Sequence, residues 1–175
     1  MAVPATKTFT NGVLDSSDLN TYVRDPIQYL LSRTMAELRQ TVAQSIPSGT
    51  FTGITFDVED LDTDGGHSTS SNTSRFTAPN AGWYFCSGGV GFSASATGQR
   101  GAAWAVNGTT LNGTSVFVNA SAAFTTIIAA RSKLLYLNVS DYVELQALQN
   151  TGGALNTNVT TDGQSSMSVQ WVRGG

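Results

Sequence analysis

The chain has few charged residues. They make up 12% of its 175 residues, which is about half the usual share of a soluble domain. The net charge is -3 and the 9 basic residues are scattered singly, so the sequence lacks the basic patch that a nucleic-acid backbone requires. Ser, Thr, Asn and 18 Gly take the place of the missing charge, and this composition suits strands and tight turns better than long helices. The composition predicts a folded, mainly β protein that does not bind nucleic acid.

Cysteine and histidine are nearly absent, with one residue of each. A single cysteine, Cys86, excludes an internal disulfide framework, and its apolar surroundings in "GWYFCSGGVGF" favour a buried thiol over a nucleophile. His67 is far from Cys86 in the sequence, and neither a Gly-x-Ser-x-Gly pattern nor a phosphate-binding glycine loop before a helix occurs. We therefore expect a protein that is not an enzyme and has no cofactor.

Long hydrophobic runs are also missing. The stretch Met1 to Thr10 has no apolar core of the kind that signal peptides carry, and no segment is long enough to cross a membrane. We therefore expect synthesis in a host cytoplasm and no membrane insertion.

The first 46 residues have a helical pattern. Asp15 can cap a first helix that should stop at Asp25, because the residue before a proline avoids helical angles. Asp25-Pro26 then favours the start of a second helix that runs to about Gln44 and ends before Pro47-Ser48-Gly49. The sequence predicts a helical anchor or stalk segment at residues 1–46 and a head domain at residues 47–175.

Apolar residues follow one side of that second predicted helix. Leu31, Met35, Leu38 and Val42 recur at the spacing of an a/d seam over about two heptads. A helix this short is marginal in water, so it needs a partner. Packing on its own domain is one option. Because the seam is narrow and charged residues flank it, we favour self-association into a stalk through these four residues.

Beyond Gly49 the pattern is that of short strands. Apolar and polar residues alternate over 50–56, an aromatic and glycine-rich segment covers 82–92, and Asn107-Gly108 between two β-prone runs is a strong hairpin signal. Further strands are expected over 124–130, 133–137, 142–148 and 166–173. About eight strands without a helix between them predict a jelly-roll β-sandwich.

Four segments in this order resemble the globular-head jelly roll shared by complement component q and tumour necrosis factor. They are "ITFDVEDLDTDGG", "SRFTAPNAGWYFCSGG", "YLNVSDYVELQALQN" and "SSMSVQWV", and together they span about residues 50 to 173. The expected core and turn positions of this motif are Phe56, Phe76, Pro79, Gly82, Tyr84, Val143, Leu145 and Trp171. The resemblance implies a tight homotrimer of jelly-roll heads with a binding or structural role and, in many members, an N-terminal stalk.

A second resemblance lies near the N-terminus. The segment "FTNGVLDSSDLNTYVRDPIQYLLSR" is similar to the start of many tail-associated proteins of bacteriophages that infect actinobacteria. In those proteins a G-x-x-L-x-x-x-D-L-N element precedes a helix and anchors a distal domain on the virion. The resemblance implies a minor tail protein of a bacteriophage virion, placed at the tail tip or in a short tail fibre.

These resemblances together imply a viral structural protein. Residues 1–46 would bind other virion structural proteins, and the trimeric head would face outward, with a host cell-surface glycan as a further candidate partner. A head fibre or decoration protein of the capsid is the alternative within this class. A soluble glycan-binding lectin or adhesion module is the alternative from another class.

The most acidic stretch of the chain is "DVEDLDTDGGH". Asp60, Asp62 and Asp64, followed by Gly65, match the opening of a calcium-binding loop. A complete loop would need an acidic ligand at its twelfth position, and that position is Ser71. We therefore expect a solvated polar turn, with the three aspartates as the alternative candidate ligands of a calcium ion.

Overall fold

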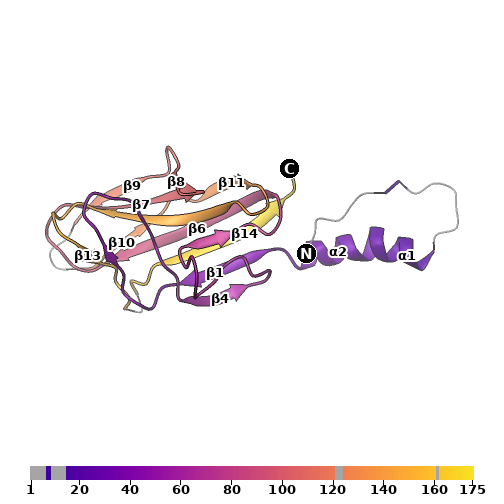
Figure 1. Cartoon of the computed structure of the whole chain (residues 1–175), viewed down its shortest axis with the longest axis horizontal. Helices are drawn as coiled ribbons and strands as arrows, with labels where there is room; N and C mark the ends of the chain where they lie inside the picture. The colour runs from indigo at the N-terminus through magenta and orange to yellow at the C-terminus, as the bar shows by residue number, and fades with distance from the viewer. Residues whose placement is uncertain (1–6, 9–14, 121–123, 161) are drawn as a thin grey trace.

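The computed structural model describes the chain except for residues 1–6, 9–14, 121–123 and 161. It is a β-sandwich of the jelly-roll type with a helical run that projects from one end (Figure 1). The mainly β jelly roll predicted from the sequence is confirmed. Within the described residues, no helix has the length and the apolar character needed to cross a membrane.

The strands form two main sheets in which the paired strands are antiparallel. Sheet I contains, in order, β4 (Val58–Asp62), β1 (Met35–Arg39), β14 (Ser166–Arg173) and β6 (Gly82–Phe92), and β6 also pairs with β10 (Thr126–Ala129) and β11 (Lys133–Leu137). Sheet II contains β3 (Thr52–Gly53), β5 (Arg75–Thr77), β12 (Tyr142–Gln149), β7 (Gln99–Val106), β8 (Thr109–Thr110) and β9 (Val116–Asn119). A short pair, β2 (Ser45–Ile46) with β13 (Leu155–Asn156), lies outside both sheets.

Period-two alternation places one side of each long strand in the core. In β14, Met167, Val169 and Trp171 are buried, as the sequence predicted. The expected hairpin joins β7 to β8, and both Asn107 and Gly108 have the positive φ that such a two-residue turn requires. Strands β6, β11 and β14 have the bounds predicted from the sequence.

The residues that carried the jelly-roll resemblance belong to the core or its rim. Six of them have buried side chains, namely Phe56, Phe76, Tyr84, Val143, Leu145 and Trp171, and Gly82 is the seventh buried residue. The Tyr84 hydroxyl donates a hydrogen bond to the Asn80 carbonyl oxygen at 2.6 Å, which fixes the turn before β6. Gly82 is buried with a φ of 150°, and a Cβ there would lie 2.4 Å from the Arg173 carbonyl oxygen. Pro79 is half-buried.

The helical run differs from the two helices predicted. It starts as expected, because the Asp15 carboxylate caps it by accepting from the Asp18 N–H. It does not stop at Asp25 but continues through α1 (Ser16–Leu19), the π-helical segment η1 (Asn20–Arg24) and α2 (Asp25–Leu31). The Asp25 N–H bonds to the Asn20 carbonyl, five residues back, and this wider turn accommodates Pro26 within the helix.

The prediction that the second helix continues to Gln44 is wrong. Residues Met35–Arg39 form β1, which lies between β14 and β4 inside sheet I. The helix-forming residues of "MAELR" take up a strand because pairing on both sides and burial of Leu38 outweigh their weak intrinsic preference. Residues 35–46 thus belong to the sandwich, and the helical segment ends near residue 31 instead of 46.

The a/d seam predicted for a stalk is therefore not a surface of one helix. Leu31 ends α2 and is 80% exposed, whereas Leu38 is fully buried in the core. Met35 lies at the start of β1, half-buried, and Val42 lies beyond β1 and is 66% exposed. These four residues do not face a common partner.

Candidate self-association face

The outward side of sheet I carries large apolar side chains, where a solvated sheet would carry polar ones. In β6, Tyr84 and Cys86 point into the core, while Trp83 and Phe85 are 41% and 40% exposed. In β11, Leu135 and Leu137 point inward, while the outward side chains are exposed. The outward side of sheet I therefore carries an apolar surface, which we call the outer face. It is made by Leu61, Trp83, Phe85, Ile127, Leu134 and Tyr136.

Cross-strand pairing gathers the aromatic residues of the outer face at the end where the helix leaves. Trp83 pairs with Tyr136, and their ring centroids lie 5.7 Å apart in an edge-to-face arrangement. Phe85 pairs with Leu134 on the next outward position. Exposed apolar groups that are contiguous in this way are typical of surfaces that bind another protein.

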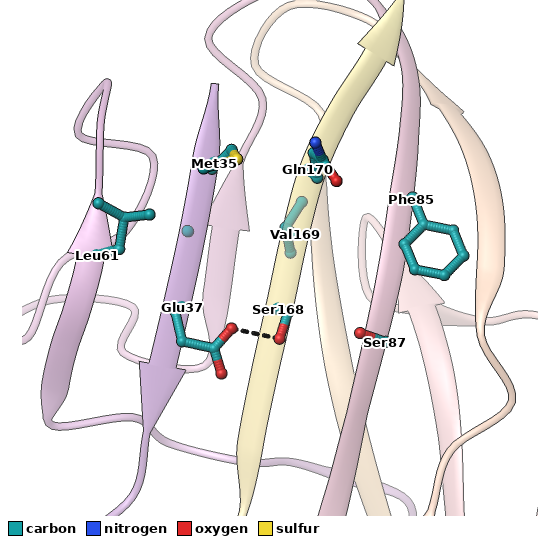
Figure 2. A pocket seen from close by; sticks show the side chains of 9 residues that line it. Met35, Glu37, Leu61, Phe85, Ser87, Ser168, Val169 and Gln170 are labelled. Carbon is teal, nitrogen blue, oxygen red and sulfur yellow. Dashed lines mark hydrogen bonds between the residues drawn. The ribbon is translucent and has the colours of Figure 1, made fainter. Parts of the chain in front are cut away.

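A shallow hollow of about 230 Å³ lies beside this aromatic end (Figure 2). Met35, Leu61 and Phe85 supply its apolar walls. Its polar members are Glu37, Ser87, Ser168 and Gln170, and the Ser168 hydroxyl donates a hydrogen bond to the Glu37 carboxylate. The hollow can therefore accept an apolar side chain of a partner and offers a carboxylate at its rim.

Farther along β6 the outward positions become small. Ser87 and Gly89 follow Phe85 on the same side of the strand, whereas Gly91 is buried, and a Cβ there would lie 1.7 Å from the Gly163 carbonyl oxygen of the same chain. Small residues on an outward surface allow the backbone of a neighbouring chain to approach closely. The outer face thus has a bulky aromatic end near the helix and a flat end away from it.

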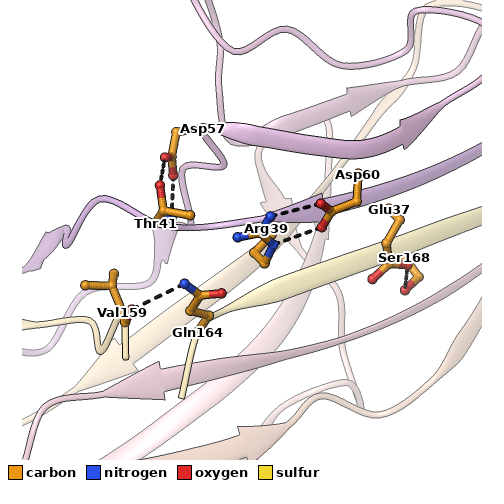
Figure 3. Close-up of polar contacts among 8 residues, drawn as sticks. All are labelled: Glu37, Arg39, Thr41, Asp57, Asp60, Val159, Gln164 and Ser168. Carbon is orange, nitrogen blue, oxygen red and sulfur yellow. Dashed lines mark hydrogen bonds and ion pairs between the residues drawn. The ribbon is translucent and has the colours of Figure 1, made fainter. Parts of the chain in front are cut away.

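Two carboxylates at the edge of sheet I are held by hydrogen bonds, one by an arginine and one by uncharged groups (Figure 3). The Arg39 guanidinium donates two hydrogen bonds of 2.9 Å to the Asp60 carboxylate, and this contact lowers the pKa of Asp60 and raises that of Arg39. Burial raises the pKa of Asp57, but hydrogen bonds donated by Thr41 and the Val42 N–H lower it, and the net pKa lies below its usual value.

The three aspartates proposed as calcium ligands point to different partners. Asp60 bonds to Arg39, Asp62 accepts from the backbone N–H groups of Gly66 and His67, and Asp64 accepts from the Thr34 hydroxyl at 2.6 Å. In the described part of the chain, no three His, Cys, Asp or Glu side chains are grouped as a metal would require. The segment is not simply a loop, because Val58–Asp62 forms the edge strand β4.

Cys86 and His67 are buried parts of the fold and are not placed for catalysis. Cys86 is fully buried, and burial raises the pKa of its thiol to about 12, so the reactive thiolate is disfavoured. His67 is nearly buried, with its two ring nitrogens 2.8 Å and 3.2 Å from the carbonyl oxygens of Arg75 and Phe56. These contacts tie β5 to the start of the acidic segment.

Sequence reasoning missed the outer face, although a signal for it was present. The runs "GWYFC" and "KLLYL" are apolar at consecutive positions, so they are apolar on both sides of their strands. In an antiparallel sheet with one solvated side, alternation of apolar and polar residues is expected instead. Two neighbouring strands that both break this rule point to a sheet that is covered on both sides.

The comparisons with known proteins agree on the fold. No protein-family model matches the chain. Among solved structures, murine APRIL at pH 5.0 superposes with a TM-score of 0.58 at 13% identity, covering 79% of this chain and 98% of that one. Eiger TNF from S. frugiperda superposes with a TM-score of 0.57 at 9% identity, covering 82% and 95% of the two chains. At such identities the likeness establishes a tumour-necrosis-factor-like jelly roll and no more.

One curated relative is viral. An uncharacterized protein of Acanthamoeba polyphaga mimivirus is 36% identical over 118 residues, which is 65% of this chain. The chain spans 50% of the length of that relative.

Proposed function

We propose that the protein is a homotrimeric, non-enzymatic structural protein of a virus particle, whose jelly-roll heads associate through the outer face. The exposed apolar surface of sheet I is the observation that carries this proposal. Its aromatic end places Trp83, Phe85 and Leu134 in water in the single chain, which is unfavourable by about 25 cal/mol per Å² of apolar surface. A second and a third copy of the chain would cover these side chains.

The number three comes from the resemblance of the head to complement component q and tumour necrosis factor, which implies a trimer. The likeness of the fold to APRIL and Eiger TNF supports that part of the resemblance. The outer face cannot close on itself in one chain, because it is the far side of a sheet whose inner side already covers the core.

The assignment to a virus particle has two supports. The mimivirus relative is a viral protein, although this chain spans half of it. The N-terminal segment resembles the anchoring element of bacteriophage tail proteins, from which we propose a minor tail protein or short tail fibre that is attached by its N-terminal region. A head fibre or capsid decoration protein is the second placement that the same observations fit.

The end of the sandwich away from the helix does not favour glycan binding as the main task. A lectin would present Trp or Tyr side chains beside Asn or Asp on its distal loops. The distal segments 93–98 and 150–154 consist of small and polar residues, and Phe124, which is 72% exposed before β10, is neither a Trp nor a Tyr. The exposed Trp83–Tyr136 pair lies on sheet I at the opposite end, because Trp83 pairs with Arg173 beside the start of β1. A spacer or decoration role fits such loops better than a lectin role.

Light scattering tests the oligomeric state. The purified chain should have three times the mass of the 18.4 kDa monomer at micromolar concentration. The Phe85→Lys variant should be monomeric and folded, because Phe85 is 40% exposed and its loss leaves the core intact. Val42→Lys changes an exposed apolar residue outside sheet I and should stay trimeric. A monomeric wild-type chain, or a trimeric Phe85→Lys variant, would contradict the proposal.

A further inference from the structure

The N-terminal helix, meaning residues 16–31, carries an apolar stripe whose four side chains are exposed in the described part of the chain. Leu19, Val23, Ile27 and Leu30 are 46%, 40%, 51% and 57% exposed. Their spacings of four, four and three residues make an 11-residue period, which holds apolar residues on one side of helices that wind around each other. The stripe lies N-terminal to the seam that the sequence suggested, and it belongs to one continuous helical run.

One residue of the stripe, Ile27, lies on the side of the helix opposite its contact with the sandwich. Tyr29 is buried, and its ring packs edge-to-face against Trp171 at a centroid distance of 5.0 Å. Trp171 points to the core side of sheet I, so the Tyr29 side of the helix faces that way too. Ile27 and Leu31, two residues before and after Tyr29, lie roughly 160° around the helix from it. They therefore point away from the core side of sheet I, and Ile27 is the one that belongs to the stripe.

The helix needs a partner to be stable. It projects beyond the sandwich along the long axis of the molecule, and α2 contacts the sandwich through Tyr29 (Figure 1). Helices of this length are marginal in water without tertiary packing, and a partly exposed apolar stripe adds no packing to stabilise them. The π-helical turn at Asn20–Arg24 contains no buried residue.

We propose that the N-terminal helices of three copies pack in parallel through this stripe, forming a three-helix bundle that extends the trimer of heads. The proposal rests on the trimer of the preceding section. The occupant is a second copy because the helix that carries the stripe is joined to the sheet that carries the outer face: Ser32, Arg33 and Thr34 connect α2 to β1 of sheet I. When three outer faces meet around one axis, the helix ends attached to them meet as well.

Cysteine cross-linking in the full-length chain tests the bundle. Val23→Cys and Ile27→Cys place a thiol in the stripe, and Thr21→Cys places one at an exposed position away from it. The native Cys86 is fully buried, so it does not compete. Under mild oxidation, two of the three thiols at position 23 or 27 should join. Denaturing gels should then show covalent dimers at least ten times faster than with Thr21→Cys.

Three outcomes separate this inference from the trimer itself. Fast cross-linking at positions 23 and 27 in a particle of trimer mass supports the bundle. A trimer in which Val23→Cys and Ile27→Cys react no faster than Thr21→Cys overturns the bundle and leaves the trimer of heads standing. A monomer by light scattering overturns both, and the wild-type chain measured alone reveals that case.

Discussion

At the scale of single residues, burial separates positions that the sequence had grouped together. Leu38 and Val42 fall on the same predicted seam, yet Leu38 is fully buried between the sheets and Val42 is 66% exposed. No spacing rule distinguishes them, because an apolar residue four places from another fits a helix face equally well in both cases. The difference arises from the partner strands of β1, which lie far away in the sequence.

Truncation to alanine should reveal this difference. Leu38→Ala should lower the free energy of unfolding by about 2–5 kcal/mol, because it leaves a cavity in the core. Val42→Ala should change it by less than about 0.5 kcal/mol, since the side chain is mostly in water. Denaturant unfolding at one fixed chain concentration measures both. Equal losses of unfolding free energy at the two positions would instead support the predicted helical seam.

A second residue-scale prediction concerns the stability of the fold at low pH. The pKa of Asp57 in the folded protein lies below its usual value, because hydrogen bonds from Thr41 and Val42 outweigh the effect of burial. A carboxylate of this kind stabilises the fold above the unfolded pKa of about 4, and that stabilisation is lost as the pH falls through the lower folded pKa. Asp57→Asn should therefore have a lower Tm than the wild type near neutral pH, and the gap should shrink below about pH 4.

The control for this experiment is Glu59→Gln, which removes one negative charge at an exposed position on β4. Melting curves from pH 2 to pH 7 compare the three proteins. A Tm gap for Asp57→Asn that stays constant across this range would show that the Thr41 hydrogen bonds do not depend on the charge of Asp57.

At the scale of elements, strands with strong local signals were predictable and β1 was not. Alternation and aromatic content gave β6, β11 and β14 their bounds, and Asn107-Gly108 marked its hairpin. The residues of β1 favour a helix, and only long-range pairing with β14 makes them a strand. The π-helical turn was missed because a local rule was followed where it does not hold. The residue before a proline avoids helical angles in most chains, but Asp25 before Pro26 stays in the helix here.

The same logic applies to the candidate site. Most of the predicted core residues were recoverable from motif order, because they sit where strand alternation points inward, whereas Phe56 lies just before β4 and Pro79 in the turn before β6. The outer face was not, because exposure on the second side of a sheet depends on what covers it. Only the doubly apolar runs of β6 and β11 indicated a partner surface.

Hydrogen exchange should distinguish the elements. Amides of β1 bond to β14 on one side and β4 on the other, so those of Ala36 and Leu38 should be protected nearly as well as the centre of β14. Amides of the N-terminal helix should be protected in the trimer and exchange fast in the monomeric Phe85→Lys variant. Protection of the helix that does not differ between trimer and monomer would show that the single chain holds it.

At the scale of the whole molecule, the division into parts follows the path of the chain through sheet I. The sequence placed the division at residues 46 and 47, where Pro47-Ser48-Gly49 interrupts the pattern. The structure runs β1 through the middle of sheet I and pairs β2 with β13 before that point. The helical run and the sandwich instead meet at Ser32 and Arg33, between α2 and β1.

Two truncated chains should therefore behave differently. A chain that begins at Gly49 lacks β1, so β14 loses its partner on one side, β4 loses its only neighbour in sheet I, and the core loses Leu38. Removing an interior strand exposes apolar side chains and unpaired backbone groups of both neighbours, and we expect this chain to be unfolded or aggregated.

A chain that begins at Ser32 keeps every strand and the outer face, and gives up only the helix and the contact between Tyr29 and Trp171. It should fold with a somewhat lower Tm and remain trimeric if the heads supply most of the interface, while losing the N-terminal region through which we propose attachment to the particle. Circular dichroism, light scattering and incorporation into virions measure these three properties in turn. A folded chain from Gly49 would show that β1 is dispensable, and a chain from Ser32 that still enters particles at the normal copy number would place attachment in the head.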